Sequence, residues 1–95
     1  MKVEHQEREN RFIVRFEDDE AELVYSRPGS GLIDLEHTYV PQSARGQGVG
    51  EALAAAAFDY ARAHGDKVIP SCPFVRRWLQ SNRQVADLVD SRYAT

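Results

Sequence analysis

The sequence is poor in cysteine: Cys72 is the only one in 95 residues. A single cysteine excludes an internal disulfide framework, so the fold has to rest on its hydrophobic core. Small secreted domains commonly depend on disulfides, and their absence here favours a reducing compartment, the cytoplasm. A chain of 95 residues is also the length of one domain.

Long hydrophobic runs are also missing. No apolar stretch of the sequence approaches the ~20 residues that a membrane-spanning helix needs. The first ten residues are polar and charged, and they lack the apolar centre of a signal peptide. We therefore expect a cytoplasmic protein without a membrane partner. Residues 1–10 are expected to form a flexible lead-in, and residues 11–95 the single domain.

The sequence has no excess of positive charge, since its formal net charge is −3. It also has no basic stripe interleaved with aromatic residues, which argues against a nucleic-acid partner. The charge is uneven: residues 1–36 contain five basic and ten acidic residues, and residues 37–95 contain seven basic and five acidic ones. The second part is therefore suited to a small anionic ligand. The acidic run Glu17–Glu20 is typical of a solvated hairpin turn, and no metal site is expected.

Alternating apolar residues predict three strands in the first part of the chain. Their ranges are Arg11–Glu17, Ala21–Arg27 and Leu32–Val40. Short turns separate them, so we expect an antiparallel meander. In the third strand the alternation places His37 on the apolar face with Ile33 and Leu35, and Thr38 on the opposite face.

The second part of the chain predicts helices and one more strand. The alanine-rich segment Gly48–His64 favours a long helix with one buried face, and Gly65 is a natural stop. Lys67–Ser71 predicts a fourth strand that pairs in parallel after a crossover. Pro73–Ser81 and Gln84–Asp90 predict two short helices. The expected fold class is α/β (or α+β), with a mixed, mostly antiparallel sheet packed by one long and two short helices.

The most informative segment is the glycine-rich run before the long helix, Arg45-Gly46-Gln47-Gly48-Val49-Gly50. Glycines at every second position let backbone N–H groups approach a ligand closely. The free N–H groups and the positive dipole end of a helix follow at once, and together these features suit a pyrophosphate. A Walker loop would need a lysine after the glycines, and a dinucleotide fingerprint would need a different glycine spacing.

These residues resemble a known signature. Arg45-x-x-Gly48-x-Gly50 matches the acetyl-CoA motif Q/R-x-x-G-x-G/A of the GNAT acetyltransferases. Two further motifs, His37-Thr38-Tyr39-Val40-Pro41 and Ile69-Pro70-Ser71-Cys72-Pro73-Phe74-Val75, are similar to those of a subfamily of short, stand-alone GNAT domains. The resemblance runs from about Arg11 to Asp90. It implies a GNAT-like fold that lacks the final strands of a full domain.

The resemblance also implies a function. It predicts an N-acetyltransferase with acetyl-CoA as cosubstrate, no metal, and an unidentified amine as acceptor. The cofactor-binding residues that we predict are Val40, Arg45, Gly46, Gln47, Gly48, Val49, Gly50 and Arg76. A protein that binds CoA or acyl-CoA without turnover, as a sensor or interaction module, is the alternative, and a domain without a ligand is a third. A monomer is favoured in each case.

Two residues are candidates for catalysis. Cys72 lies between a strand and a helix that starts with proline, where a helix N-terminus lowers the pKa of a thiol. It is either a nucleophile that takes the acetyl group first or a small packing residue. His37 is either a general base for the amine or a hydrogen-bonded core histidine.

Overall fold

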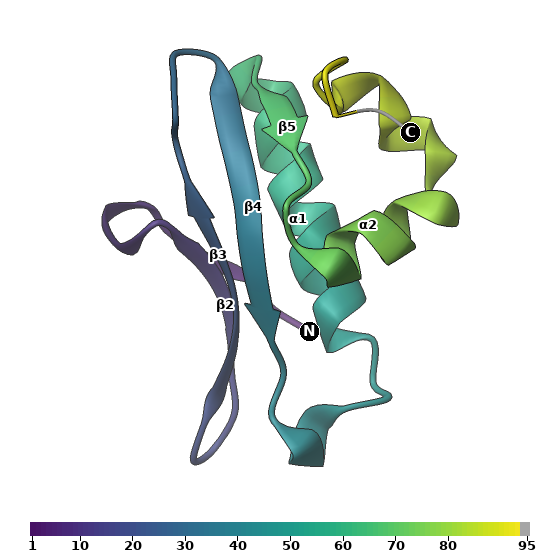
Figure 1. Cartoon of the computed structure of the whole chain (residues 1–95). Coiled ribbons are helices and arrows are strands. Elements are labelled where there is room, and N and C mark those ends of the chain that lie inside the picture. Colours follow the sequence, from purple (N-terminus) through teal and green to yellow (C-terminus); the bar gives the residue numbers. More distant parts are fainter. Residues whose placement is uncertain (94–95) are drawn as a thin grey trace.

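Five strands form one sheet in the computed structural model, which describes residues 1–93. The strands are β1 (Glu4–Gln6), β2 (Arg11–Arg15), β3 (Glu20–Ser26), β4 (Leu32–Tyr39) and β5 (Lys67–Ile69). They lie in sequence order; the first four pair antiparallel, and β5 pairs parallel with β4. This arrangement confirms the predicted meander and the parallel strand that follows the crossover (Figure 1).

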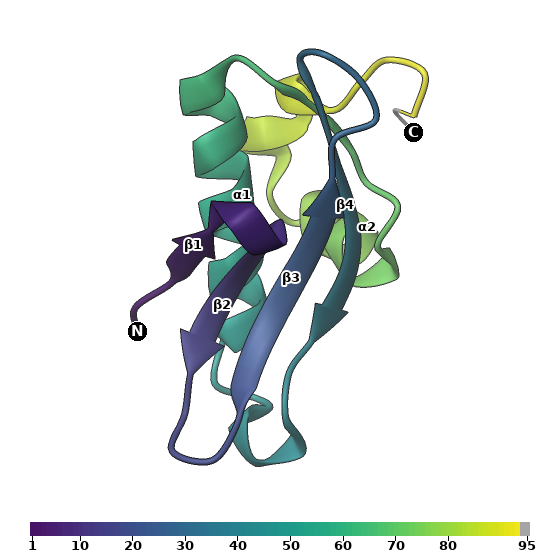
Figure 2. The same ribbon diagram turned by 90° about the vertical axis from the view of Figure 1, so that its left-hand side faces the viewer.

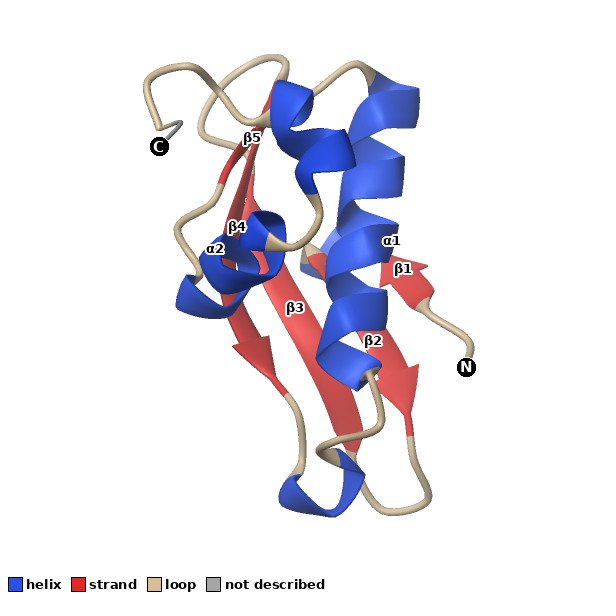
Figure 3. Ribbon diagram, turned by 90° about the vertical axis from the view of Figure 1, so that its right-hand side faces the viewer, coloured by secondary structure: helices blue, strands red, loops and turns tan. Residues whose placement is uncertain are grey.

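Two α-helices cover one face of this sheet, α1 (Val49–His64) and α2 (Pro73–Gln80) (Figure 3). Short 3₁₀ helices are η1 (Glu7–Glu9), η2 (Gln42–Ala44) and η3 (Arg83–Leu88), and η3 coincides with most of the last predicted short helix. Neither α1 nor α2 lies on the opposite face of the sheet (Figure 2). The predicted fold class is confirmed. Within residues 1–93, no helix has the length and apolar character to cross a membrane.

The long helix α1 packs its small and apolar side chains onto the sheet. Leu53, Ala57 and Phe58 are almost fully buried, against sheet residues such as Leu23 and Leu35. Alanines on this face let the helix lie close to the strands without crowding. The helix ends as predicted at Gly65, whose φ of 77° is left-handed and so suits a residue without a Cβ.

The first ten residues are not the lead-in that we expected, because Glu4–Gln6 pairs with β2 as an edge strand. Its central residue, His5, stacks on Phe12 with ring centroids 4.1 Å apart and hydrogen-bonds the Tyr25 hydroxyl at 2.7 Å. On the other side of β1, Glu4 accepts a 2.9 Å hydrogen bond from Arg15. A three-residue polar strand gives no alternation signal, so it was missed.

Strand β4 contains an extra residue, and the side chains beyond it point to the opposite faces of the sheet from those that strict alternation predicts. Val24 of β3 pairs with His37, but the next residue, Tyr25, pairs with Leu35. Glu36 is therefore left over as a β-bulge, and the alternation shifts by one residue beyond it. As a result Thr38 points to the helix side of the sheet, and His37 points to the open side and is exposed. The predicted placement of His37 on the apolar face is wrong for this reason.

Candidate functional site

A cleft of about 520 Å³ opens where β4 ends and α1 begins. One wall is the end of β4 with the loop that follows it, and the other is the first turn of α1 with Phe74 and Arg77 of α2. Six of the eight predicted cofactor-binding residues line it: Val40, Arg45, Gly46, Gly48, Val49 and Gly50. The cleft therefore contains most of the predicted cofactor-binding residues, including most of the glycine-rich run.

Two glycines of the run hold a backbone that other residues adopt only with strain. Gly46 and Gly48 have φ values of 81° and 78°, and a Cβ at either position would meet no atom within 4 Å. Gly48 is also the residue that precedes the first turn of α1. The first N–H groups of a helix have no partner within the helix, so this turn presents free donors to the cleft.

Gly50 has a different role. A Cβ there would lie 2.7 Å from Cζ of Phe74, which is far inside ordinary contact distance. Because Gly50 has no side chain, the ring of Phe74 in α2 packs directly on the first turn of α1. The third glycine of the motif therefore sets how closely the two helices approach, and with it the width of the cleft between them.

The charges at the cleft are mainly positive. Arg45 and Arg77 line it, and Glu51 in the first turn of α1 is the acidic residue among its lining. The Nε of Arg45 donates a 3.1 Å hydrogen bond to the carbonyl of Val40, which fixes this guanidinium at the cleft. Two cations beside a helix N-terminus make the site attractive to phosphate groups.

Two predicted cofactor-binding residues do not line the cleft. Gln47 turns away and contacts the carbonyl of Ser43 at 3.4 Å. Arg76 is bound to the backbone, because its Nη1 donates to the carbonyls of Pro70 at 3.0 Å and Ser71 at 2.6 Å. Its neighbour Arg77 occupies the place at the cleft that we had predicted for Arg76.

Phe74 and Arg77 of α2 line the cleft, although neither is among the predicted cofactor-binding residues. They are three residues apart and so share one face of α2. The spacing was visible in the sequence, but it did not show which face of α2 meets α1. That is decided by the contact between Gly50 and the ring of Phe74.

Cys72 lies behind the cleft and does not line it. It is 2% exposed, so its thiol is closed to solvent. Its backbone N–H donates to the carbonyl of Leu35 at 2.8 Å, and its sulfur lies 3.3 Å from the hydroxyl oxygen of Thr38. Thr38 does line the cleft, so it is the residue that connects this thiol to the site.

His37 lies on the opposite side of β4 from the cleft, because of the bulge at Glu36. Its neighbour Glu36 accepts a 2.8 Å hydrogen bond from the Ser26 hydroxyl on the same open face. The strand pairing between β4 and β5 ends at Asp34 and Ile69, so the rest of β4 has no strand partner on this side. The two faces of the sheet are therefore not separated by a strand there.

The described residues 1–93 include no cluster of three or more His, Cys, Asp or Glu side chains suited to a metal ion. The polar groups that line the cleft are backbone donors, the guanidinium groups of two arginines, the hydroxyls of Thr38 and Tyr39, and the carboxylate of Glu51. This set is suited to holding a phosphorylated ligand along the glycine-rich run.

Comparison with known proteins gives a family. The family model described as GCN5-related N-acetyl-transferase matches residues 11–88. Among curated relatives, Protein NATD1 of Homo sapiens is 34% identical over 84 residues, which are 86% of this chain and 74% of the relative. Protein NATD1 of Gallus gallus is 33% identical over 84 residues, covering 86% of this chain and 76% of that protein.

A solved structure shows the same architecture. The solution structure of a GCN5-like protein from Staphylococcus aureus superposes with a TM-score of 0.75 at 28% sequence identity. The match covers 94% of this chain and 87% of the other. The similarity therefore extends over both the sheet and the two helices that border the cleft.

Proposed function

The chain belongs to the GCN5-related N-acetyl-transferase family, and from this premise we propose that it transfers the acetyl group of acetyl-CoA to an amine. The observation that carries the proposal is the cleft at the start of α1, where Gly46, Gly48 and the free N–H groups of the helix meet Arg45 and Arg77. We place this activity in the cytoplasm, where the single thiol, Cys72, stays reduced.

In this proposal the glycine-rich run holds the pyrophosphate of CoA. Backbone N–H groups and a helix dipole supply a site for anions that needs no side chain, and the left-handed glycines keep that backbone uncovered. Arg45 and Arg77 add two cations for the remaining phosphate charge. The thioester then extends along the end of β4 towards Thr38.

The proposed reaction forms a C–N bond and an S–H bond, and it breaks a C–S bond and an N–H bond of the amine. The neutral amine nitrogen attacks the thioester carbonyl carbon, the C–N bond forms, the C–S bond breaks, and the CoA thiolate leaves and takes up a proton. Because CoA fills the helix side, the acceptor approaches from the open face, beyond the point where β4 and β5 part. His37 is exposed on that face and is the proposed base.

Calorimetry with acetyl-CoA, ATP and NAD tests the binding half of this proposal. We expect acetyl-CoA to bind most tightly, since the loop has neither the lysine of a Walker motif nor the glycine spacing of a dinucleotide fold. ATP binding as tightly as acetyl-CoA would contradict the assignment of the cleft. Failure of acetyl-CoA to bind would remove the proposed function altogether.

Release of the CoA thiol with a panel of lysine peptides and polyamines tests the transfer half. We expect His37→Gln to lower kcat and to leave the affinity for acetyl-CoA unchanged, because the residue lies across β4 from the cleft. An unchanged kcat would show that His37 is not the base. Tight binding of acetyl-CoA without transfer to any amine would instead support the alternative of a CoA-binding sensor, which the same cleft would serve.

A further inference from the structure

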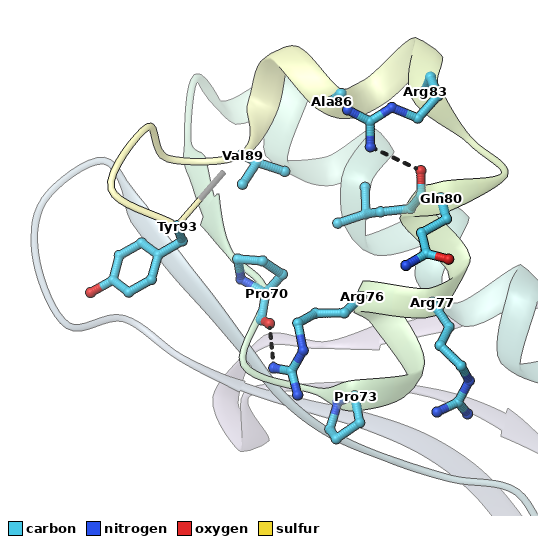
Figure 4. Close-up of a pocket in the computed structure, with 10 residues that line it drawn as sticks. Pro70, Pro73, Arg76, Arg77, Gln80, Arg83, Ala86, Val89 and Tyr93 are labelled. Carbon is cyan, nitrogen blue, oxygen red and sulfur yellow. Dashed lines mark hydrogen bonds between the residues drawn. The ribbon is translucent and has the colours of Figure 1, made fainter. Parts of the chain in front are cut away.

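A second pocket, of about 370 Å³, lies on the other side of α2 from the cleft. Its floor is apolar and includes Pro70, Leu79 and Val89, from the end of β5, from α2 and from the segment after η3. Figure 4 shows its polar rim, with Arg76 and Arg77 on one side, Arg83 on the other, and Gln80 between them. Arg77 lines both this pocket and the cleft.

The rim is unusual for this protein in having cations without counter-charges. Most arginines elsewhere form ion pairs with carboxylates: Arg11, Arg15, Arg27, Arg62 and Arg92. Within residues 1–93, the three arginines of the rim form none, and no acidic side chain lines the pocket. Three guanidinium groups that share one opening repel one another unless an anion joins them.

One of these arginines is already held in place. The Nη1 of Arg76 donates to the carbonyls of Pro70 and Ser71, which positions the guanidinium at the rim (Figure 4). Arg83 has only a 3.4 Å contact with the carbonyl of Leu79 and stays available to a ligand. A fixed cation opposite an available one, over an apolar floor, suits a ligand that has an anionic head and an apolar body.

We propose that this pocket binds a small organic anion, a carboxylate or phosphate monoester with an apolar body, independently of the acetyl-CoA cleft. The anion lies between Arg76 and Arg83, and the body rests on Leu79 and Val89. The pocket is of a size suited to such a molecule. The proposal does not depend on acetyl transfer, so either can fail while the other stands.

The experiment is a titration followed by amide NMR signals, without acetyl-CoA. The probes are benzoate, phenyl phosphate and the uncharged benzamide, which has the same ring as benzoate. We expect the two anions to shift the signals of residues 76–89 along saturating curves, and benzamide to leave them unchanged. Equal shifts with benzamide, or shifts confined to residues 45–51 at the cleft, would overturn the proposal.

Matched variants separate this site from general attraction of anions. Arg83→Gln removes a rim cation with little structural contact and should weaken benzoate binding about tenfold or more, since a charge-assisted hydrogen bond is lost. Arg8→Gln removes an exposed arginine of η1 that forms no ion pair within the described residues, and it should bind benzoate as the wild type does. Equal weakening in both variants, or no weakening in Arg83→Gln, would refute the site.

Discussion

Gly48 and Gly65 flank the two ends of α1 with nearly the same left-handed backbone, at φ values of 78° and 77°. A Cβ at either position would meet no atom within 4 Å, so a larger residue is opposed by the backbone conformation and not by neighbours. Such a conformation costs a residue other than glycine on the order of 1–3 kcal/mol. We expect Gly48→Val and Gly65→Val to lower the free energy of unfolding by similar amounts in this range, which corresponds to roughly 4–8 °C in Tm per kcal/mol.

The two variants should differ in affinity for acetyl-CoA, because only Gly48 lines the cleft. A valine there keeps the pyrophosphate from the backbone, and losing one hydrogen bond to a charged group, worth about 1.5–3 kcal/mol, weakens binding about 10- to 100-fold. Gly65→Val should bind as the wild type does. The assay is calorimetry at a temperature where all three proteins are folded. Equal affinities, or equal weakening in both variants, would refute the assignment of Gly48 to the site.

Two further predictions concern Cys72, which is buried, and His5, which is half-buried. Cys72 is 2% exposed, so iodoacetamide should modify it slowly in the folded protein and rapidly in denaturant. Cys72→Ala should retain acetyl transfer. Fast modification of the folded protein, or loss of transfer in the variant, would restore Cys72 as a candidate nucleophile. His5 should titrate below its ordinary pKa of 6.5, because burial against Phe12 and Tyr60 disfavours its charged form. The unfolded chain then takes up a proton more readily, so this contribution to stability is fully present above the ordinary pKa and is lost as the pH drops below it. His5→Phe should reduce that loss in urea unfolding, and an identical pH dependence would contradict it.

Much of the fold could be predicted from the sequence because its signals are local. Alternation marks the strands of the meander, and the alanine-rich run with Gly65 marks α1 and its end. The edge strand Glu4–Gln6 gave no such signal, since it is held by contacts made far along the chain. His5 reaches Tyr25, twenty residues away, and polar residues alone do not reveal that pairing.

Part of the candidate site could likewise be predicted from local sequence signals, and part could not. The loop Arg45–Gly50 was predictable because glycines before a helix leave backbone N–H groups open to an anion. Two of these glycines are left-handed, and most of the loop lines the cleft. Which of Arg76 and Arg77 lines the cleft could not be predicted, because it depends on how α2 is rotated against α1. The ring of Phe74 on Gly50 fixes that rotation and brings Arg77, three residues on, to the cleft.

The catalytic candidates depend on a single residue of β4. Without the bulge at Glu36, His37 would face the helices and Thr38 the open side, as strict alternation requires. With the bulge, the Thr38 hydroxyl meets the Cys72 thiol behind the cleft, and the imidazole lies on the face from which an acceptor can approach. A bulge needs an unequal residue count between two paired strands, and this is a property of the pair β3 and β4 that neither strand shows alone. The division of roles between cofactor side and acceptor side therefore comes from the register between these strands, so deleting Glu36 should remove the bulge and still leave His37 opposite Val24 and Thr38 opposite Leu23.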